Sequence, residues 1–125
     1  MSIRPVSELV ADAKARVRSI SPQEAREAAE RGALLVDIRD IRELDREGRV
    51  PGAFHAPRGM LEFWVDPASP YYKEALSARP LILFCAAASR SALAADALQQ
   101  MGVPHVSEIE GGFGAWRDAG LPISR

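Results

Sequence analysis

The chain has 125 residues, of which 47% are hydrophobic and 26% are charged, and its formal net charge is −1. This length suits one domain with one core, and a near-neutral charge without a cluster of lysines and arginines argues against a nucleic-acid partner. No stretch approaches the roughly 20 apolar residues that span a bilayer, and the N-terminus lacks a signal-peptide core, so we expect a cytoplasmic protein with no membrane partner.

The first part of the chain predicts two helices and a buried strand. Apolar residues recur at helical spacing over residues 6–17, which indicates an amphipathic helix. Ser21 and Glu24 form a capping-box pattern around a proline, and Gly32 provides a stop, so a second helix is expected between them. The continuous apolar run of residues 33–38 is typical of a strand buried on both faces of a parallel sheet.

The middle of the chain is expected to be mostly helical, with one short strand. The charged residues 40–47 predict a short helix that ends at a glycine. A proline-glycine turn follows and leads to a short strand at residues 53–56. Two further helices, over residues 58–65 and from about residue 71 to 77, are separated by a pair of prolines.

The last part of the chain predicts two strands and two helices. Residues 81–84 form the most strand-like segment, and an apolar stripe at helical spacing follows and ends at Gly102. The stripe comprises Leu93, Ala94, Ala97, Leu98 and Met101. A short strand is expected at residues 105–109, and after a turn at two glycines a last helix at residues 113–119. Because strands alternate with helices, we expect an α/β fold with a central, mostly parallel sheet and helices on both faces.

Cys85 is the only cysteine, and it follows the predicted strand at residues 81–84 directly. A single cysteine excludes an intramolecular disulfide, and two distant histidines argue against zinc, so we expect no metal and no cofactor. Parallel sheets bind ligands beyond the carboxyl ends of their strands, and loop N–H groups at a helix start favour a thiolate or a bound anion. The loop and the first turn of the helix comprise Ala86, Ala87, Ala88, Ser89, Arg90 and Ser91. We therefore expect sulfur chemistry at Cys85, with Arg90 as a permanent cation beside it.

Several of these residues also have a structural interpretation. A lone cysteine is more often a small buried hydrophobe, and Arg90 also fits a solvated residue in the first turn of a helix. Asp37, at a strand end, is expected to fix loops by accepting backbone hydrogen bonds. Arg39 and Glu43 are four residues apart and form a candidate surface ion pair worth under about 1 kcal/mol.

Two residues further along, Arg58 and Trp64, are weaker candidates. Arg58 and Trp64 lie in a segment that a fold of this kind can place near the mouth of a site, although a helix packed over the sheet edge explains them equally well. Trp116 is expected to be a core residue. The pair Gly111 and Gly112 lacks the spacing of a dinucleotide fingerprint and is interpreted as a turn.

Four segments in a fixed order resemble the single-domain rhodanese-like sulfurtransferases. They are residues 35–39 with Glu43, residues 48–53, residues 84–91, and residues 110–113 with Trp116 and residues 120–122. The resemblance covers about residues 19–124, so we expect a rhodanese-like domain at residues 19–125 and a packed N-terminal helical extension at residues 1–18. It implies a cysteine that accepts a sulfane sulfur, becomes a persulfide and passes the sulfur to a thiophilic acceptor.

The resemblance also assigns roles to residues. Cys85 is the catalytic residue, the loop residues with Arg90 bind the substrate, and Arg58 is a further candidate for substrate binding. Asp37, Arg39 and Glu43 support the site. The implied donor is thiosulfate, another small molecule or a partner protein's persulfide, and the implied acceptor is a thiol or a cyanide-like nucleophile. Since thiolate and persulfide anion carry no proton, no general base is required.

Two departures and two alternatives accompany this resemblance. Ala88 stands where the family often has glycine, and Arg49 stands where it often has histidine. We expect the backbone of Ala88 to avoid the left-handed region, which would be strained for alanine. Because the loop is lined by alanines and offers few cations beyond Arg90, we expect thiosulfate to be a mediocre donor. One alternative is a catalytically silent interaction or regulatory module with the same fold. The other, a cysteine phosphatase, is disfavoured because four residues separate Cys85 from Arg90 where such phosphatases have five.

Overall fold

A five-stranded parallel sheet is the centre of the computed structural model, which describes residues 2–125. The strands are β1 (Arg18–Ile20), β2 (Leu34–Asp37), β3 (Phe54–His55), β4 (Leu81–Phe84) and β5 (Val106–Ile109). Their order across the sheet is β1-β5-β4-β2-β3, and each neighbouring pair is parallel. The expected parallel sheet is confirmed, and β4, the strand that precedes Cys85, lies in the middle of it.

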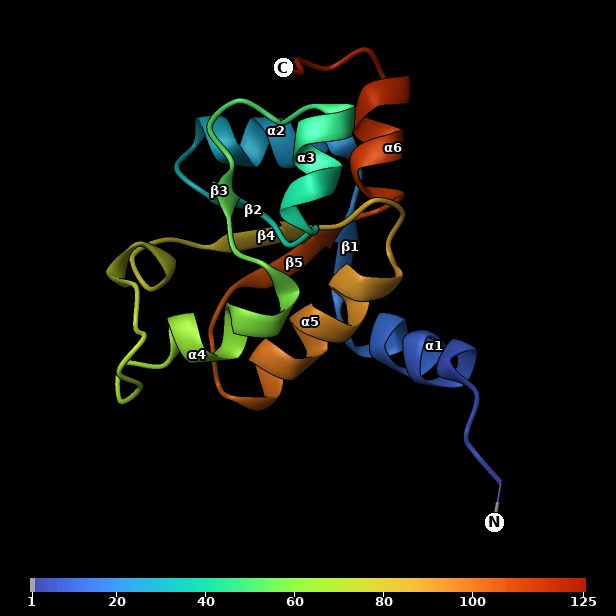
Figure 1. The fold of residues 1–125 in the computed structure, drawn as a ribbon, viewed down its shortest axis with the longest axis vertical. Coiled ribbons are helices and arrows are strands. Elements are labelled where there is room, and N and C mark those ends of the chain that lie inside the picture. The colour runs from blue at the N-terminus through green and yellow to red at the C-terminus, as the bar shows by residue number, and fades with distance from the viewer. Residues whose placement is uncertain (1) are drawn as a thin grey trace.

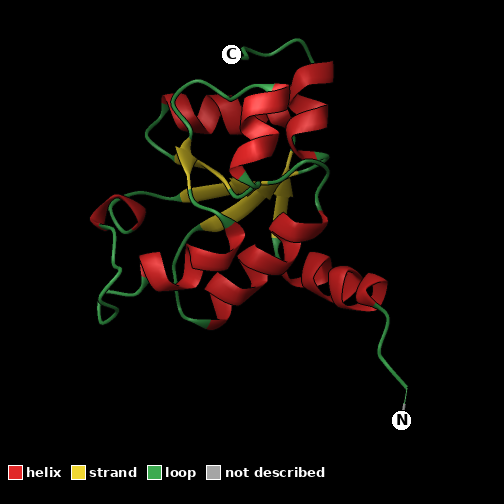
Figure 2. Cartoon of the chain, viewed as in Figure 1, coloured by secondary structure: helices red, strands yellow, loops and turns green. Residues whose placement is uncertain are grey.

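Six α-helices cover the two faces of the sheet within the described residues (Figures 1 and 2). They are α1 (Val6–Arg16), α2 (Pro22–Glu30), α3 (Ile41–Glu47), α4 (Leu61–Val65), α5 (Ser89–Gln100) and α6 (Gly112–Asp118). Helices α1, α4 and α5 lie on one face, and α2, α3 and α6 lie on the other (Figure 1). Helices on both faces were expected from the alternation of strands and helices, and that expectation is also confirmed.

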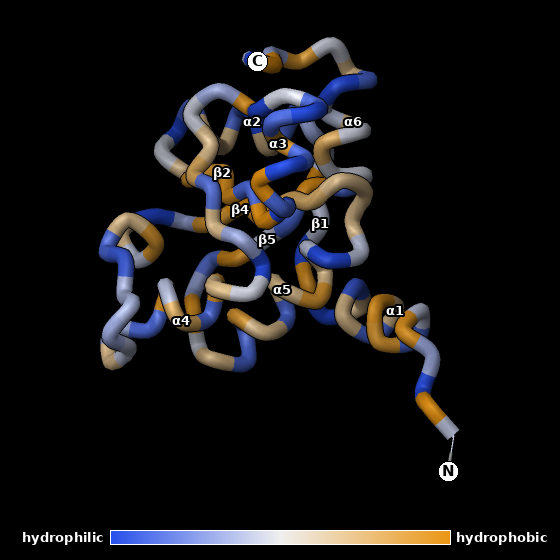
Figure 3. Tube along the Cα trace, viewed as in Figure 1, coloured by the Kyte–Doolittle hydropathy of each residue, from blue (hydrophilic) through white to orange (hydrophobic). Residues whose placement is uncertain are grey.

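The core is split between the two faces by the alternation of side chains along β4. Leu81, Leu83 and Cys85 belong to the apolar cluster beneath α4 and α5, whereas Ile82 and Phe84 belong to the cluster beneath α2 and α6. Every residue of β2 and β4 is buried, and both strands show as hydrophobic segments at the centre of Figure 3. Each fully buried aliphatic or aromatic side chain of this kind contributes about 1.5–3 kcal/mol to folding.

Two capping boxes fix helix starts near the sheet. Ser21 and Glu24 cap α2 reciprocally, as the sequence predicts. Asp40 and Glu43 form a second box at the start of α3, in which the Glu43 carboxylate accepts from the Asp40 amide at 3.0 Å. This second box, which the sequence analysis did not identify, holds the Glu43 side chain at the end of α3 nearest the carboxyl edge of the sheet.

Two expected helices are wrong in detail, and one strand was missed. The helix expected at residues 71–77 is only a 3-10 turn at Glu74–Leu76, because the Lys73 amide donates to the Trp64 carbonyl at 2.8 Å and holds the preceding residues extended. The helix expected at residues 58–65 is divided into a 3-10 turn at Arg58–Met60 and the short α4. Strand β1 was not predicted, since three residues with one buried side chain show no periodicity.

The apolar stripe predicted on α5 is also partly wrong. Ala94 and Leu98 are buried as expected, but Met101 is exposed and Leu93 and Ala97 are only half-buried. The fully covered positions include Ser91, Ala92 and Ala95 instead. Small residues on this side of α5 allow the helix to lie close to the sheet.

Helix α1 packs on α5 and leads directly into β1. Ala13 is fully buried there, and Arg16 forms an ion pair with Asp96 of α5 at 2.6 Å. The Gln99 side chain also donates to the Arg16 carbonyl at 3.2 Å. Helix α1 is therefore in contact with α5, the helix that begins at the Cys85 loop. Met1, which the expected N-terminal extension includes, lies outside the described residues. Within residues 2–125, no helix is long and apolar enough to cross a bilayer.

Candidate active site

Cys85 follows the last residue of β4, and its side chain is 1% exposed. The start of α6 holds its backbone in place: the Phe113 amide donates to the Cys85 carbonyl at 2.8 Å, and the Gly114 amide donates to the Ala86 carbonyl at 3.1 Å. Gly112 is required at this contact, because a Cβ atom there would lie 2.5 Å from the carbonyl oxygen of Cys85 and from that of Ala87. Helix α6 therefore fixes the carbonyl side of the loop.

The N–H side of the same loop is free. Among residues 2–125, no backbone or side-chain atom accepts a hydrogen bond from the amides of residues 86–91. Ala88 has φ of −176°, so it avoids the left-handed region, and its carbonyl accepts from the Ala92 amide to begin α5. A row of uncommitted amides at the positive end of a 12-residue helix favours an anion beside Cys85.

Ser91 connects the Cys85 thiol to a buried carboxyl group. Its Oγ lies 3.6 Å from Cys85 Sγ and 2.6 Å from Glu108 Oε1. The second carboxyl oxygen of Glu108 accepts from Ser19 of β1, also at 2.6 Å. Glu108 is fully buried, and the sequence analysis missed it. The available signal was a glutamate inside the strand expected at residues 105–109. In the sheet this strand lies next to β4, the strand that precedes Cys85.

Arg90 forms a two-pronged ion pair with Glu43 across the carboxyl edge of the sheet. Its two terminal nitrogens lie 2.8 and 3.0 Å from the two carboxylate oxygens of Glu43. The guanidinium lowers the pKa of Glu43 from its usual 4.5 to about 2. The hydrogen bonds that Arg90 donates to Glu43, with a smaller contribution from Cys85, raise the pKa of Arg90. Arg90 therefore ties the first turn of α5 to α3, while 43% of its side chain stays exposed to solvent.

Asp37, the last residue of β2, forms a buried ion pair with Arg39. The Arg39 side chain is fully buried, and its Nη2 lies 2.8 Å from Asp37 Oδ2 and 2.9 Å from the Gly48 carbonyl. Its guanidinium also lies 4.0 Å above the Phe113 ring, which ties it to α6. The expected surface ion pair between Arg39 and Glu43 is therefore wrong: Arg39 turns inward to Asp37 at the end of β2, and Glu43 takes Arg90 instead.

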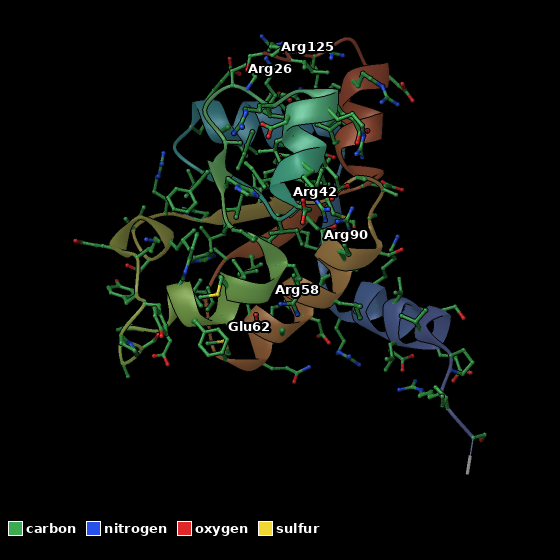
Figure 4. All side chains as sticks on the ribbon, in the orientation of Figure 1. Arg26, Arg42, Arg58, Glu62, Arg90 and Arg125 are labelled. Carbon is green, nitrogen blue, oxygen red and sulfur yellow. The ribbon has the colours of Figure 1, made fainter. Side chains whose placement is uncertain are left out.

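The segment before α4 brings Arg58 to the same edge of the sheet. The Arg58 amide donates at 3.2 Å to the Ile38 carbonyl, and the Ile38 amide in turn donates to the Phe84 carbonyl at 3.0 Å. The Arg58 guanidinium pairs with Glu62 at 2.6 Å. In the view of Figure 4, Arg90 lies between Arg42 of α3 and Arg58.

The two tryptophans have structural contacts. Trp64 packs edge-on against Phe54, with ring centroids 6.3 Å apart, and Lys73 Nζ lies 4.8 Å above its ring. Trp116 is 2% exposed and donates to the Pro122 carbonyl at 2.7 Å. Trp116 is thus a core residue, as predicted, and Trp64 packs over the sheet edge. Across residues 2–125 there is no group of three or more potential metal-binding side chains.

Comparison with known proteins identifies the family. A family profile described as "Rhodanese-like domain" matches residues 21–119. Thiosulfate sulfurtransferase GlpE from Ectopseudomonas mendocina is 35% identical over 100 residues, which cover 80% of this chain and 84% of that protein.

Solved structures agree with the sequence matches. A protein of unknown function from Rhodopseudomonas palustris, described as a possible tyrosine phosphatase, is 43% identical with a TM-score of 0.93, over 99% of this chain and 98% of its own. The polysulfide-sulfur transferase homodimer from Wolinella succinogenes is 30% identical with a TM-score of 0.74, over 94% of this chain and 86% of its own. With its parallel sheet, its cysteine loop after β4 and these relatives, the chain belongs to the rhodanese-like domain family.

Proposed function

We propose that the protein is a sulfurtransferase or persulfide carrier that moves a sulfane sulfur through a persulfide on Cys85. The observation that carries the proposal is the loop: the one thiol directly precedes a row of backbone amides that have no acceptors among residues 2–125, at the start of α5. Relatives named as sulfurtransferases at 30–35% identity support the same chemistry.

The proposed reaction has two half-reactions. In the first, the Cys85 thiolate attacks the sulfane sulfur of the donor, a new S–S bond forms, and the donor's bond to that sulfur breaks with its electron pair on the leaving group. In the second, a thiol or cyanide-like acceptor attacks the terminal sulfur, and the Cys85 thiolate leaves. The amides of residues 86–91 stabilise the anionic terminal sulfur without a proton transfer.

The loop composition bears on the donor. Its walls are Ala86, Ala87 and Ala88, and its one cation, Arg90, already binds Glu43 through both terminal nitrogens. A dianion such as thiosulfate would thus meet little uncompensated positive charge in the loop. A persulfide donor needs to bring only its terminal sulfur to Cys85, so it depends less on that charge. We therefore expect a low-molecular-weight persulfide or a partner protein's persulfide to be a better donor than thiosulfate. A reducing compartment such as the cytoplasm suits a working thiol.

Two other functions compete with this proposal. The R. palustris relative is described as a possible tyrosine phosphatase, but the four residues between Cys85 and Arg90 enclose a small loop, and Arg90 is engaged by Glu43. A silent interaction module would keep this fold without turnover. Release of phosphate from p-nitrophenyl phosphate by the wild type, lost in Cys85→Ser, would favour the phosphatase.

A donor and acceptor panel tests the proposal. Wild type and Cys85→Ser are given thiosulfate or glutathione persulfide, with cyanide or dithiothreitol as acceptor, and thiocyanate or sulfide is measured. We expect turnover by the wild type with the persulfide donor and none by Cys85→Ser. Equal background rates for both proteins with every donor would reject transfer through Cys85.

A further inference from the structure

We infer that Glu43 determines which sulfur donors Cys85 accepts, because it neutralises Arg90 and so disfavours anionic donors; this rests on the proposed function. Glu43 lies in the first turn of α3 and Arg90 in the first turn of α5, and the two side chains meet in a two-pronged ion pair. Ser91, the residue after Arg90, has its Oγ 3.6 Å from Cys85 Sγ. The charge of this ion pair is therefore set next to the residue that contacts the thiol.

The Glu43 carboxylate is held from two sides. Its Oε1 accepts from Arg90 Nη2 at 3.0 Å, and its Oε2 accepts both from Arg90 Nη1 at 2.8 Å and from the Asp40 amide at 3.0 Å. Because the pKa of Glu43 is lowered to about 2, the carboxylate is ionised at neutral pH. A donor anion that displaced Glu43 from Arg90 would have to move an oxygen that also caps α3.

The neighbouring arginines also have carboxylate partners. Arg42 pairs with Asp40 at 2.9 Å, and Arg58 pairs with Glu62 at 2.6 Å. In the view of Figure 4, these two arginines lie on either side of Arg90. Since each of the three guanidinium groups is matched by a carboxylate, none of them brings an uncompensated positive charge to this part of the surface.

This compensation selects against negative charge in the donor. A second anion beside Arg90 would share one guanidinium with the ionised Glu43, and like charges that close repel each other. A donor without a negative charge near its sulfane sulfur does not meet this repulsion. Glutamine in place of Glu43 would leave Arg90 unmatched, and an unmatched guanidinium in a half-buried site attracts anions strongly.

The test compares two reagents of different charge on the same thiol. Iodoacetate is an anion and iodoacetamide is its neutral analogue, and Cys85 is the only cysteine that either can alkylate. Both react with the thiolate, so the ratio of their rate constants does not depend on how much thiolate is present. The ratio is measured at neutral pH and low ionic strength, where charges are least screened.

Four variants are compared with the wild type. Glu43→Gln and Arg90→Gln each remove one charge of the ion pair, and the double variant removes both. Glu47→Gln makes the same substitution near the other end of α3, where the carboxylate pairs with Arg46 instead, and is the matched control. Thermal melting of each variant identifies a change in folding.

We expect Glu43→Gln to raise the ratio of the iodoacetate rate to the iodoacetamide rate at least about fivefold, and Glu47→Gln to leave it within about twofold of wild type. Arg90→Gln, which leaves Glu43 unmatched, should lower the ratio at least about fivefold. The double variant, with neither charge, should stay within about twofold of wild type. If Glu43→Gln melts early, Arg90→Gln still tests the inference through a change of the opposite sign.

Several results would overturn the inference. If loss of the ion pair merely loosened the loop, both reagents would react faster and the ratio would not change. A gain that persists in the double variant would show that Arg90 has no part in it, and an equal gain in Glu47→Gln would show that any carboxylate of α3 has the same effect. A Cys85 that neither reagent alkylates in any variant would show that no small anion approaches this ion pair.

The two proposals fail separately. If the ratio changes as expected but no donor loads Cys85 with sulfur, the proposed function is wrong and Glu43 still selects reagents by their charge. If a persulfide loads Cys85 while the ratio stays unchanged, the proposed function stands and Glu43 does not select the donor. Where both hold, Glu43→Gln should have a higher kcat/KM for thiosulfate than the wild type, and a value no higher would overturn the inference.

Discussion

The ion pair between Glu43 and Arg90 links α3 to the first turn of α5, and its contribution to stability can be measured with Glu43→Gln. Glutamine is close in shape and can still accept from the Asp40 amide, as glutamate does at 3.0 Å, so the capping box survives. The substitution therefore removes the charge that Arg90 contacts at 2.8 and 3.0 Å and little else.

The magnitude follows from the Glu43 pKa. A fall from 4.5 to about 2 corresponds to about 3.4 kcal/mol if each unit is worth about 1.36 kcal/mol. Arg90 is 43% exposed and Glu43 17% exposed, so solvent screens the pair and we expect about 1–2 kcal/mol at neutral pH.

The direction of the pKa shift fixes how the stabilisation by this ion pair changes with pH. The pKa of Glu43 is lower in the folded protein than in the unfolded chain, so the stabilisation is complete above about pH 5 and is lost as the pH falls towards about 2. Urea unfolding, followed by tryptophan fluorescence, should show Glu43→Gln less stable than wild type at pH 7. By about pH 3 the difference should be under half its neutral value.

The control is Glu24→Gln, which changes the same position of the other capping box, where Ser21 is the hydrogen-bond partner. It should cost less than Glu43→Gln at neutral pH. A Glu43→Gln difference that stays constant from pH 7 to about pH 3 would refute the assignment of the stabilisation to the charge pair.

Three further predictions concern the same region. Ala88→Gly should lower stability by about 0.4–1 kcal/mol, because φ of −176° suits alanine and glycine adds freedom to the unfolded chain; a higher melting midpoint would contradict this. Arg39→Met should cost about 3–5 kcal/mol in urea unfolding, since it leaves Asp37 buried without its partner, and a neutral result would show that the pair is dispensable. Arg90→Ala should raise the apparent KM for an anionic donor more than Arg90→Lys does, because lysine keeps the positive charge that alanine removes; equal KM values for all three proteins would remove Arg90 from donor binding.

Features with a local sequence signal were predicted correctly. Ser21 and Glu24 lie three residues apart, and the run at residues 81–84 is apolar at every position, so the start of α2 and strand β4 could be identified without the fold. The loop after β4 follows from the same information, and this was enough to single out Cys85.

Features that depend on strand order were missed. Glu43 and Arg90 are 47 residues apart, and Ser91 meets Glu108 only because β5 lies next to β4 under α5. Periodicity does not encode which strands are neighbours, so the sequence offered Arg39 as the nearer partner for Glu43. Arg39 instead turns to Asp37, because a buried strand end with an unpaired carboxylate would be costly.

The most direct test of sulfur transfer through Cys85 is the intact mass of the protein after exposure to glutathione persulfide and removal of excess donor. We predict that the wild type gains the mass of one sulfur atom, that cyanide removes it with release of one equivalent of thiocyanate, and that Cys85→Ser gains nothing. A wild type whose mass does not change, or a Cys85→Ser protein that gains the same cyanide-labile sulfur, would contradict the account.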